Sequence, residues 1–406
     1  MSFADFIRQH EGDDPVRLLL SRDKYPDIDL DLAVTTLEVR RKLKTKVPEW
    51  YAVPSLIYPS RLSGEQCSSS ETAKYKAMLI DRIGREASRL RVADLTGGMG
   101  VDCWAFAQVS EGVFYNEMQE ELAEATRLNF RELGVENVRF SCKKVEVGKV
   151  REVLDGFEPD IIFLDPARRA EDGRKVFLIE ECQPDVLGLL PELFEASRFV
   201  LLKLSPMADI SMACKRLGAQ VREVHVVASG GECKELLFLL DREWDGPHSV
   251  FAVEGGAVME IPGQARNDDE EVIFDVPMAG ALLFEPGKAL AKAGAFNLPC
   301  RFGLTKLGVH THLYTGETVP EELVPYGKVF EVLEVLPLNN RTMKEAGKRW
   351  PQAEVTARNV PMTSDLLRKK IGCASGGDVH LFGVRADAAG KADNYLIVTK
   401  KRYGTD

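Results

Sequence analysis

Short apolar runs alternate with longer amphipathic segments between residues 91 and 240. Runs of this length, separated by enough chain for a helix, are typical of a parallel sheet that helices cover on both faces. The expected strands cover residues 92–95, 112–116, 138–141, 160–164, 198–204, 221–227 and 236–240. The short segment 229–233 leaves no room for a crossover helix, so the seventh strand should run antiparallel to its neighbours.

The N-terminal segment has a different pattern. Residues 1–67 mix charged residues with short apolar runs, which predicts a helical N-terminal region. Ser68 and Glu71 have the spacing of a capping box, and Tyr75 and Leu79 share one face of the helix that should follow. We therefore expect the main domain to begin at residue 68.

The pattern changes again after residue 243. A glycine pair and the acidic run 267–271 interrupt strand-like segments, which predicts a separate α+β module over residues 244–327. A final α+β module is expected over residues 328–406. The main domain would then span residues 68–243.

The composition fits a multidomain globular protein. A chain of 406 residues is longer than one hydrophobic core usually serves, and its 45% hydrophobic and 29% charged residues are ordinary proportions. No window approaches the roughly 20 apolar residues of a membrane span, and the N-terminus lacks a basic region followed by an apolar stretch. We expect a soluble, cytoplasmic protein with no membrane partner.

The cysteines and histidines give no metal-binding pattern. Eight cysteines are scattered without a CxxC pair, which disfavours a zinc ribbon and a disulfide framework. His310 and His312 could share a strand face, but no third ligand accompanies them. The sequence predicts free thiols and no bound metal.

The charge is distributed unevenly along the chain. A net charge of −10 disfavours a nucleic-acid partner unless basic residues cluster. Residues 341–402 hold 13 Lys and Arg against 6 Asp and Glu, which could follow a phosphate backbone or form a solvated helix face. The cluster consists of Arg341, Lys344, Lys348, Arg349, Arg358, Arg368, Lys369 and Lys370.

A glycine-rich turn follows the first expected strand. The strand ends at Asp94, and Gly98 and Gly100 permit backbone torsions and a close ligand approach that a side chain would block. A dinucleotide fingerprint would place glycine or alanine where Cys103 stands, and no Gly-Lys-Ser/Thr forms a P-loop. The turn therefore favours another nucleoside ligand over NAD or ATP.

Acidic residues also follow the second and fourth expected strands. Glu117 stands where a carboxylate can accept hydrogen bonds from both ribose hydroxyls, although a solvated loop acid would look the same. Asp165 ends a nearly all-apolar strand, and Pro166 fixes the exit of the chain. Because the carboxyl ends of parallel strands meet at one edge, Asp94, Glu117 and Asp165 should converge there.

These motifs resemble those of class I S-adenosylmethionine (SAM)-dependent methyltransferases. Asp94 to Gly100 is similar to motif I, Glu117 to the ribose acid, and Asp165 to Arg168 to motif IV. The whole chain is similar to bacterial methyltransferases with a THUMP-like C-terminal domain, whose signature covers residues 65–76, 358–361 and 376–383.

This resemblance implies a seven-stranded, Rossmann-like α/β sheet and SAM as the methyl donor. Gly98 and Gly100 would lie beneath the methionine moiety, Asp94 near its amino group and Glu117 on the ribose. Lys143 stands where such enzymes often carry an acid or amide for the adenine. Ser68 to Ser70, at the start of the preceding helix, could close over the donor or simply cap that helix. The implied donor-binding residues are Ser69, Asp94, Thr96, Gly97, Gly98, Gly100, Glu117, Met118, Lys143 and Asp165.

The acceptor side is predicted to involve Asp165, Pro166 and Arg168. Asp165 would position the acceptor or act as general base. Arg168 stands three places after this acid, where enzymes that methylate exocyclic base nitrogens often carry an aromatic residue. Together with Arg169 it could contact phosphate or a base, or form a surface ion pair.

Methylation of a pyrimidine carbon would need a nucleophilic thiol, for which only Cys103 and Cys233 are suitably placed. The basic cluster and the THUMP-like resemblance favour an RNA substrate, with tRNA as one candidate. Two alternatives stay open: a non-catalytic RNA-binding or assembly protein on a methyltransferase fold, and a methyltransferase that acts on a protein or small molecule.

Overall fold

The computed structural model describes residues 1–85, 90–168, 178–262, 272–388 and 390–404. The chain divides into two compact units. The first unit holds residues 1–222 and 237–247, and the second holds residues 223–236 and 248–406.

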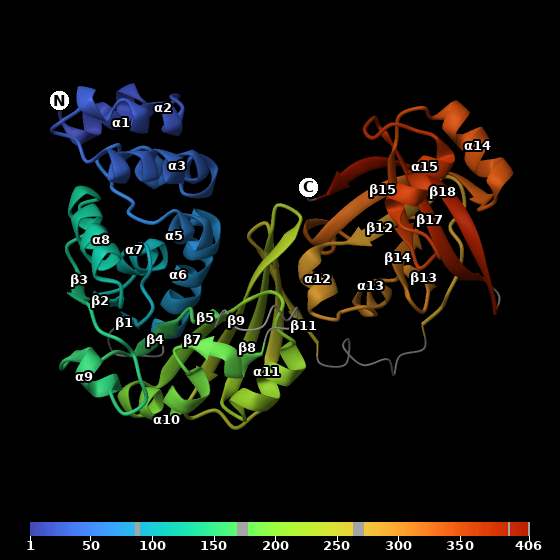
Figure 1. Cartoon of the computed structure of the whole chain (residues 1–406). Helices are drawn as coiled ribbons and strands as arrows, with labels where there is room; N and C mark the ends of the chain where they lie inside the picture. Colours follow the sequence, from blue (N-terminus) through green and yellow to red (C-terminus); the bar gives the residue numbers. More distant parts are fainter. Residues whose placement is uncertain (86–89, 169–177, 263–271, 389, 405–406) are drawn as a thin grey trace. The chain divides into compact units, whose positions relative to one another are not determined.

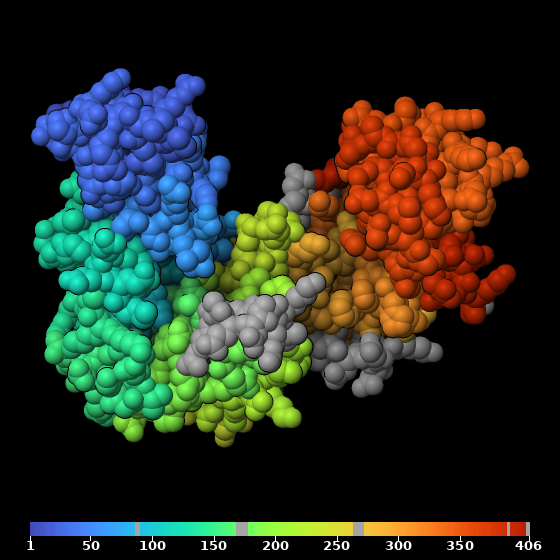
Figure 2. Space-filling model, viewed as in Figure 1, coloured from blue at the N-terminus to red at the C-terminus, as the bar shows by residue number. Residues whose placement is uncertain are grey.

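The first unit begins with helices, as the sequence predicts. They are α1 (Phe3–Gln9), α2 (Pro15–Leu20), α3 (Leu30–Lys46), α4 (Pro48–Tyr51), α5 (Arg61–Gln66) and α6 (Ser70–Gly84). The side chains of Ser2, Asp14, Asp29, Ser60 and Ser69 accept hydrogen bonds from backbone N–H groups at the helix starts. Figure 1 shows α1 and α2 stacked on α3, and their side chains form one continuous layer (dark blue in Figure 2).

A mostly parallel sheet forms the rest of the first unit. Its strands are β1 (Arg91–Asp94), β2 (Gly112–Asn116), β3 (Val138–Ser141), β4 (Ile161–Leu164), β7 (Phe199–Leu204), β8 (Val221–Ser229) and β9 (Glu232–Asp241). They follow the order β3-β2-β1-β4-β7-β9-β8, in which β8 and β9 are long strands that both units share. These seven strands confirm the predicted class I methyltransferase sheet, and two later strands of the described residues extend it beyond β8 to nine.

Helices separate the parallel strands along the chain. They are α7 (Val101–Ala107), α8 (Glu120–Glu132), α9 (Val150–Leu154), α10 (Val186–Ala196) and α11 (Ile210–Leu217). A short hairpin of β5 (Ala167–Arg168) and β6 (Cys182–Gln183) follows β4, with the single turn η2 (Ile179–Glu181) before β6. The buried amide of Asn129 on α8 exchanges two 2.8 Å hydrogen bonds with the backbone of Ile57, which joins the N-terminal region to the sheet.

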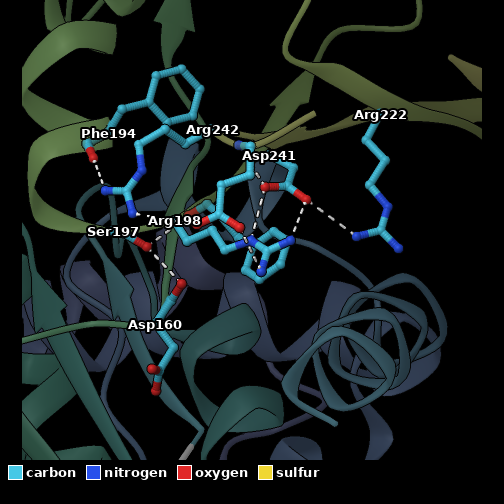
Figure 3. Close-up of polar contacts among 9 residues, drawn as sticks. Asp160, Phe194, Ser197, Arg198, Arg222, Asp241 and Arg242 are labelled. Atoms are coloured by element: carbon cyan, nitrogen blue, oxygen red, sulfur yellow. Dashed lines mark hydrogen bonds and ion pairs between the residues drawn. The ribbon is translucent and has the colours of Figure 1, made fainter. Parts of the chain in front are cut away.

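The antiparallel direction of β9 follows from a tight turn at Gly230 and Gly231, both of which have positive φ. Its last residue, Asp241, binds Arg198 at the start of β7 through two hydrogen bonds of 2.9 and 3.0 Å and Arg222 at 3.3 Å (Figure 3). Burial raises the pKa of Asp241, but hydrogen bonds from Arg198 and the other contacts lower it overall. The ionised carboxylate thus ties the end of β9 to the starts of two other strands.

The second unit continues from β8. β10 (Ser249–Glu254) lies parallel to β8, and β11 (Ala257–Ile261) pairs antiparallel with β10. Seven further strands form a second sheet in the order β13-β14-β12-β15-β18-β17-β16. These are β12 (Leu282–Pro286), β13 (Thr305–Gly308), β14 (Thr311–Gly316), β15 (Gly327–Pro337), β16 (Glu354–Arg358), β17 (Val379–Ala388) and β18 (Lys391–Gly404).

This sheet crosses the boundary that the sequence pattern predicted at residues 327 and 328. β12 pairs with β15 in the register Leu283 to Phe330, so segments from both expected modules share one sheet. β10 and β11, which also fall within 244–327, pair with β8 instead. Apolar periodicity identifies each strand but not its partner, and the predicted domain limits stay a prediction.

Helices α12 (Lys288–Lys292), α13 (Leu298–Arg301), α14 (Asn340–Arg349) and α15 (Ser364–Ile371) and the turn η4 (Val324–Tyr326) complete the second unit. The side chains of α14 and α15 form a buried cluster with Leu381, Leu396 and Val398 of the sheet. A Cβ atom on Gly347 would lie 1.9 Å from the carbonyl oxygen of Ile371, so the two helices approach closely only because residue 347 is glycine.

Candidate functional site

A cavity of about 410 Å³ opens at the carboxyl ends of β1, β2 and β4 in the first unit. Its position is the one that open α/β sheets favour for ligands. Nine predicted residues lie in its wall: Asp94, Thr96, Gly97, Gly98, Gly100, Glu117, Met118, Lys143 and Asp165. Their roles toward a ligand stay predictions.

The glycine turn between β1 and α7 forms one side of the cavity. Gly98 and Gly100 have φ values of 54° and 85°, which favour glycine. A Cβ atom on Gly97 would lie 2.2 Å from the ring of Tyr115, and one on Gly100 would lie 2.7 Å from Thr126. A Cβ atom on Gly98 would have the backbone carbonyl oxygen of Thr96, 3.9 Å away, as its nearest neighbour, so this position of the wall is open.

Hydrogen bonds connect this turn to the two neighbouring strand ends. The Gly98 N–H donates to Glu117 Oε2 at 3.0 Å, and the Gln119 N–H donates to Glu117 Oε1 at 2.9 Å. The Asp165 N–H donates to Thr96 Oγ1 at 2.6 Å, and the Thr96 N–H donates to Asp94 Oδ1 at 3.0 Å. The three acids are therefore held around one turn.

This convergence affects the pKa of Asp94. Its side chain is buried, and burial raises its pKa well above the usual 3.8. The negative charges of Asp102, Asp165 and Glu117 raise the pKa further, whereas the hydrogen bond from Thr96 lowers it. The predicted meeting of the three strand-end carboxylates at one cavity is thus confirmed.

Behind the turn lies a polar chain that the sequence analysis missed. Ser68 Oγ donates to Asp102 Oδ2 at 2.7 Å, and the buried Lys76 ammonium donates to Ser68 Oγ at 3.0 Å and pairs with Asp102 at 3.1 Å. Lys203 Nζ donates to Ser68 Oγ at 3.4 Å and to Asp165 Oδ2 at 2.5 Å. The available sequence signal was Lys203 itself, a lone charge within the apolar strand β7.

The capping box predicted from Ser68 and Glu71 is wrong by one residue. Ser69 is the N-cap of α6, and its Oγ accepts the Thr72 N–H at 3.2 Å. Ser69 lies outside the cavity wall, whereas Ser68 lies in it. The Ser68 hydroxyl is engaged by Asp102, which leaves the capping role to its neighbour.

Three predicted site residues, Lys143, Pro166 and Arg168, have contacts or positions that the sequence did not predict. Lys143 lies in the wall, but its Nζ donates to the Glu152 carbonyl at 2.7 Å, and its backbone binds the Asn116 side chain. Pro166 is buried in the turn after β4 and is not part of the wall. The backbone of Arg168 pairs with Cys182 in the β5–β6 hairpin, while its side chain and all of Arg169 lie outside the described residues.

Neither candidate thiol is activated. Burial, with the charges of Asp94 and Asp102, raises the pKa of Cys103 well above its usual 9.0. Burial also raises the pKa of Cys233 to about 11. Both thiols are therefore protonated near neutral pH, which disfavours nucleophilic attack on a pyrimidine ring.

Half of the basic cluster in the second unit is neutralised by ion pairs. Arg341 pairs with Glu345, Arg349 with Glu334, Arg358 with Glu285 and Arg368 with Asp365. Lys344 and Lys348 on α14, and Lys369 and Lys370 on α15, are exposed. These four lysines are the other half of the cluster and leave it with exposed positive charge.

Within the described ranges, no group of three or more His, Cys, Asp or Glu residues could hold a metal ion. His310 lies in the turn before β14, so it does not share a strand face with His312. None of the helices in the described part of the chain is long and apolar enough to cross a membrane.

The parallel sheet, the glycine turn and the acid after β2 define a class I methyltransferase fold. The chain is similar to a crystal structure of a candidate methyltransferase from Porphyromonas gingivalis W83, with 30% sequence identity and a TM-score of 0.84 over 98% of this chain and 97% of that one. This chain belongs to the same methyltransferase family.

Shorter matches agree with this assignment. Residues 327–401 match a THUMP domain-like family, which confirms the predicted THUMP-like C-terminal domain, and residues 282–323 match a ferredoxin-like domain. An uncharacterized RNA methyltransferase from Enterococcus faecalis (strain ATCC 700802 / V583) is 30% identical over 94 residues, which are 23% of this chain. The match spans only 21% of that relative's length.

Proposed function

We propose that this protein transfers the methyl group of SAM to RNA, with tRNA as the first candidate substrate. The observation that carries the proposal is the Glu117 carboxylate, which the Gly98 and Gln119 N–H groups hold in the wall of the cavity. A carboxylate fixed in this way can accept hydrogen bonds from both hydroxyls of a ribose. The activity would take place in the cytoplasm, where tRNA is found.

The residues of the cavity fit the donor. Gly98 offers an open position in the wall, where a larger side chain would compete with the ligand. Asp94 lies beside the turn and can pair with the amino group, and Glu117 can bind the ribose. When bound, SAM supplies a methyl group on a positively charged sulfur, which is an activated electrophile.

Asp165 would position the acceptor. Its backbone is fixed by Thr96 and its Oδ2 by Lys203, so the direction of the carboxylate is set before a substrate binds. The carboxylate side chain is 36% exposed, which leaves it accessible from the cavity. It can accept the proton that the acceptor loses on methylation.

Transfer of tritium from labelled SAM tests the proposal. RNA from a strain that lacks the gene should gain label from the wild-type protein, and Asp165→Ala should abolish the gain while SAM binding persists. Asp245→Asn, an exposed acid of the same unit, is the matched control and should behave as wild type. No SAM binding by the wild-type protein would refute the proposed function.

The ion pairs of the second unit favour one alternative, a protein or small-molecule acceptor. Four arginines of the basic cluster are already bound to acidic residues, which reduces the charge available for phosphates. The two possibilities differ in their salt dependence, because RNA binding releases counterions. RNA affinity that falls steeply with salt, and that weakens when Lys369 and Lys370 become Gln, supports RNA as the partner.

A further inference from the structure

Two lysines meet at one hydroxyl behind the proposed acceptor site. Lys76 and Lys203 both donate to Ser68 Oγ, at 3.0 and 3.4 Å. The negative charge of Asp102 compensates Lys76, and that of Asp165 compensates Lys203. The Lys203 side chain is only 12% exposed, so its charge acts with little screening by solvent.

We propose that Lys203 is a positioning residue that makes this site selective for a ribose hydroxyl of RNA. The inference rests on the proposed function and specifies which atom of the RNA is methylated. Its basis is the Lys203–Asp165 pair, which places a hydrogen-bond donor and an acceptor side by side at the carboxyl ends of β7 and β4.

The sign of the developing charge separates a hydroxyl from an amine. A neutral exocyclic amine becomes positive as it attacks a methyl group, and a fixed ammonium nearby opposes that change. A hydroxyl loses its proton instead, so its oxygen becomes more negative, and an ammonium group stabilises it. Once the acceptor proton has passed to Asp165, the charge of Lys203 is no longer compensated, and it then favours a negative oxygen over a positive nitrogen.

The described wall of the cavity has no exposed aromatic side chain on which a base could stack. Phe163 is the one aromatic residue among its described residues, and it is 1% exposed. Enzymes that act on a base commonly stack it between aromatic or apolar side chains. Apolar side chains such as Met118 and Val147 do line the wall, so the product of the reaction, and not the lining, separates a ring nitrogen from a hydroxyl.

The reaction balances without a further reactant. The hydroxyl oxygen forms a bond to the methyl carbon as the carbon–sulfur bond breaks, and the electron pair of that bond stays on sulfur. The hydroxyl proton passes to the Asp165 carboxylate, which later releases it to solvent. Lys203 keeps its proton throughout and holds Asp165 Oδ2, so that the proton moves to the other oxygen.

The identity of the product tests the inference directly. Wild-type protein, tritiated SAM and total RNA from a strain that lacks the gene are combined, and the RNA is then hydrolysed with alkali. A 2′-O-methyl group removes the hydroxyl that attacks the phosphodiester, so the label should appear in alkali-resistant dinucleotides. Label in mononucleotides would show base methylation and overturn the inference, while the proposed function would stand. Absence of label from RNA would refute both.

Variants of Lys203 give a second test. Lys203→Gln should lower the transfer rate about 100-fold, with little change in SAM affinity by calorimetry or in the thermal midpoint. Lys203→Arg keeps the charge and should restore part of the rate. Lys215→Gln, an exposed lysine on α11, is the matched control. An unchanged rate in Lys203→Gln, or equal losses of rate and SAM affinity, would contradict the role given to Lys203.

Discussion

The Asp165 N–H donates a 2.6 Å hydrogen bond to Thr96 Oγ1, which fastens the end of β4 to the glycine turn after β1. Thr96 also donates its own N–H to Asp94. Through its backbone and its side chain, Thr96 thus links Asp94 to Asp165, the residue that we propose positions the acceptor.

The Thr96→Val variant should separate the effect of this hydrogen bond on stability from its effect on methyl transfer. The variant preserves the shape but leaves the Asp165 N–H without its partner, which should lower the free energy of unfolding by about 1–3 kcal/mol. Methyl transfer should fall more than SAM affinity does, because Asp165 loses its fixed position. Urea unfolding, calorimetry and the tritium assay measure the three quantities.

Thr36→Val is the matched control for this change. Thr36 Oγ1 accepts a buried hydrogen bond from the Tyr58 N–H at 3.0 Å, and neither residue is part of the cavity wall. The Thr36→Val variant should lose about as much free energy of unfolding as Thr96→Val, but its folded form should transfer methyl groups at the wild-type rate. Equal effects of both variants on transfer would refute the positional role of Thr96.

A methyl group at residue 98 tests the open position in the cavity wall. Gly98→Ala should cost about 1–2 kcal/mol of stability, because the positive φ disfavours a Cβ atom. It should also weaken SAM binding about 10-fold, since it adds volume where the ligand is expected. Gly134→Ala has the same backbone cost, with φ of 69° and open space around it. SAM affinity that drops equally in both variants would show that the wall position is irrelevant.

Asp94 should give the protein a characteristic pH dependence. Burial raises its folded-state pKa above the usual 3.8, so the folded protein binds this proton more tightly than the unfolded chain. The resulting stability is fully present below about pH 4 and is lost as the pH rises through the raised pKa. Asp94→Asn, which can still accept the Thr96 N–H, should remove this loss from the profile of unfolding free energy against pH. Parallel profiles of unfolding free energy against pH for the wild type and Asp94→Asn would contradict the assignment of this pH dependence to Asp94.

The sequence predicted the local elements well and the contacts between elements poorly. Apolar runs identified the seven strands, and the glycines and acids after them identified most of the cavity wall. The pairing of β12 with β15 was missed because strand periodicity does not specify a partner. Lys203 was missed as well, and so were the contacts of Ser68, since they depend on a hydrogen bond between residues 135 positions apart.

The error at the start of α6 has a similar cause. Local spacing favoured Ser68, because Glu71 stands three residues after it, but the Ser68 hydroxyl donates to Asp102 and Ser69 caps the helix. The sequence pattern correctly predicted a serine cap at the start of this helix. The hydrogen bond of Ser68 to the buried Asp102 carboxylate accounts for the shift of the cap by one residue.

The proposed donor site is built around Glu117 and the glycine turn. Titration calorimetry with SAM, on the wild-type protein and on Glu117→Gln, tests this most directly, with the exposed Glu120→Gln as control. We predict saturable binding by the wild type and the control, and about 10- to 100-fold weaker binding by Glu117→Gln, because charge-assisted hydrogen bonds contribute about 1.5–3 kcal/mol. No binding by the wild type, or equal binding by all three, would contradict the account.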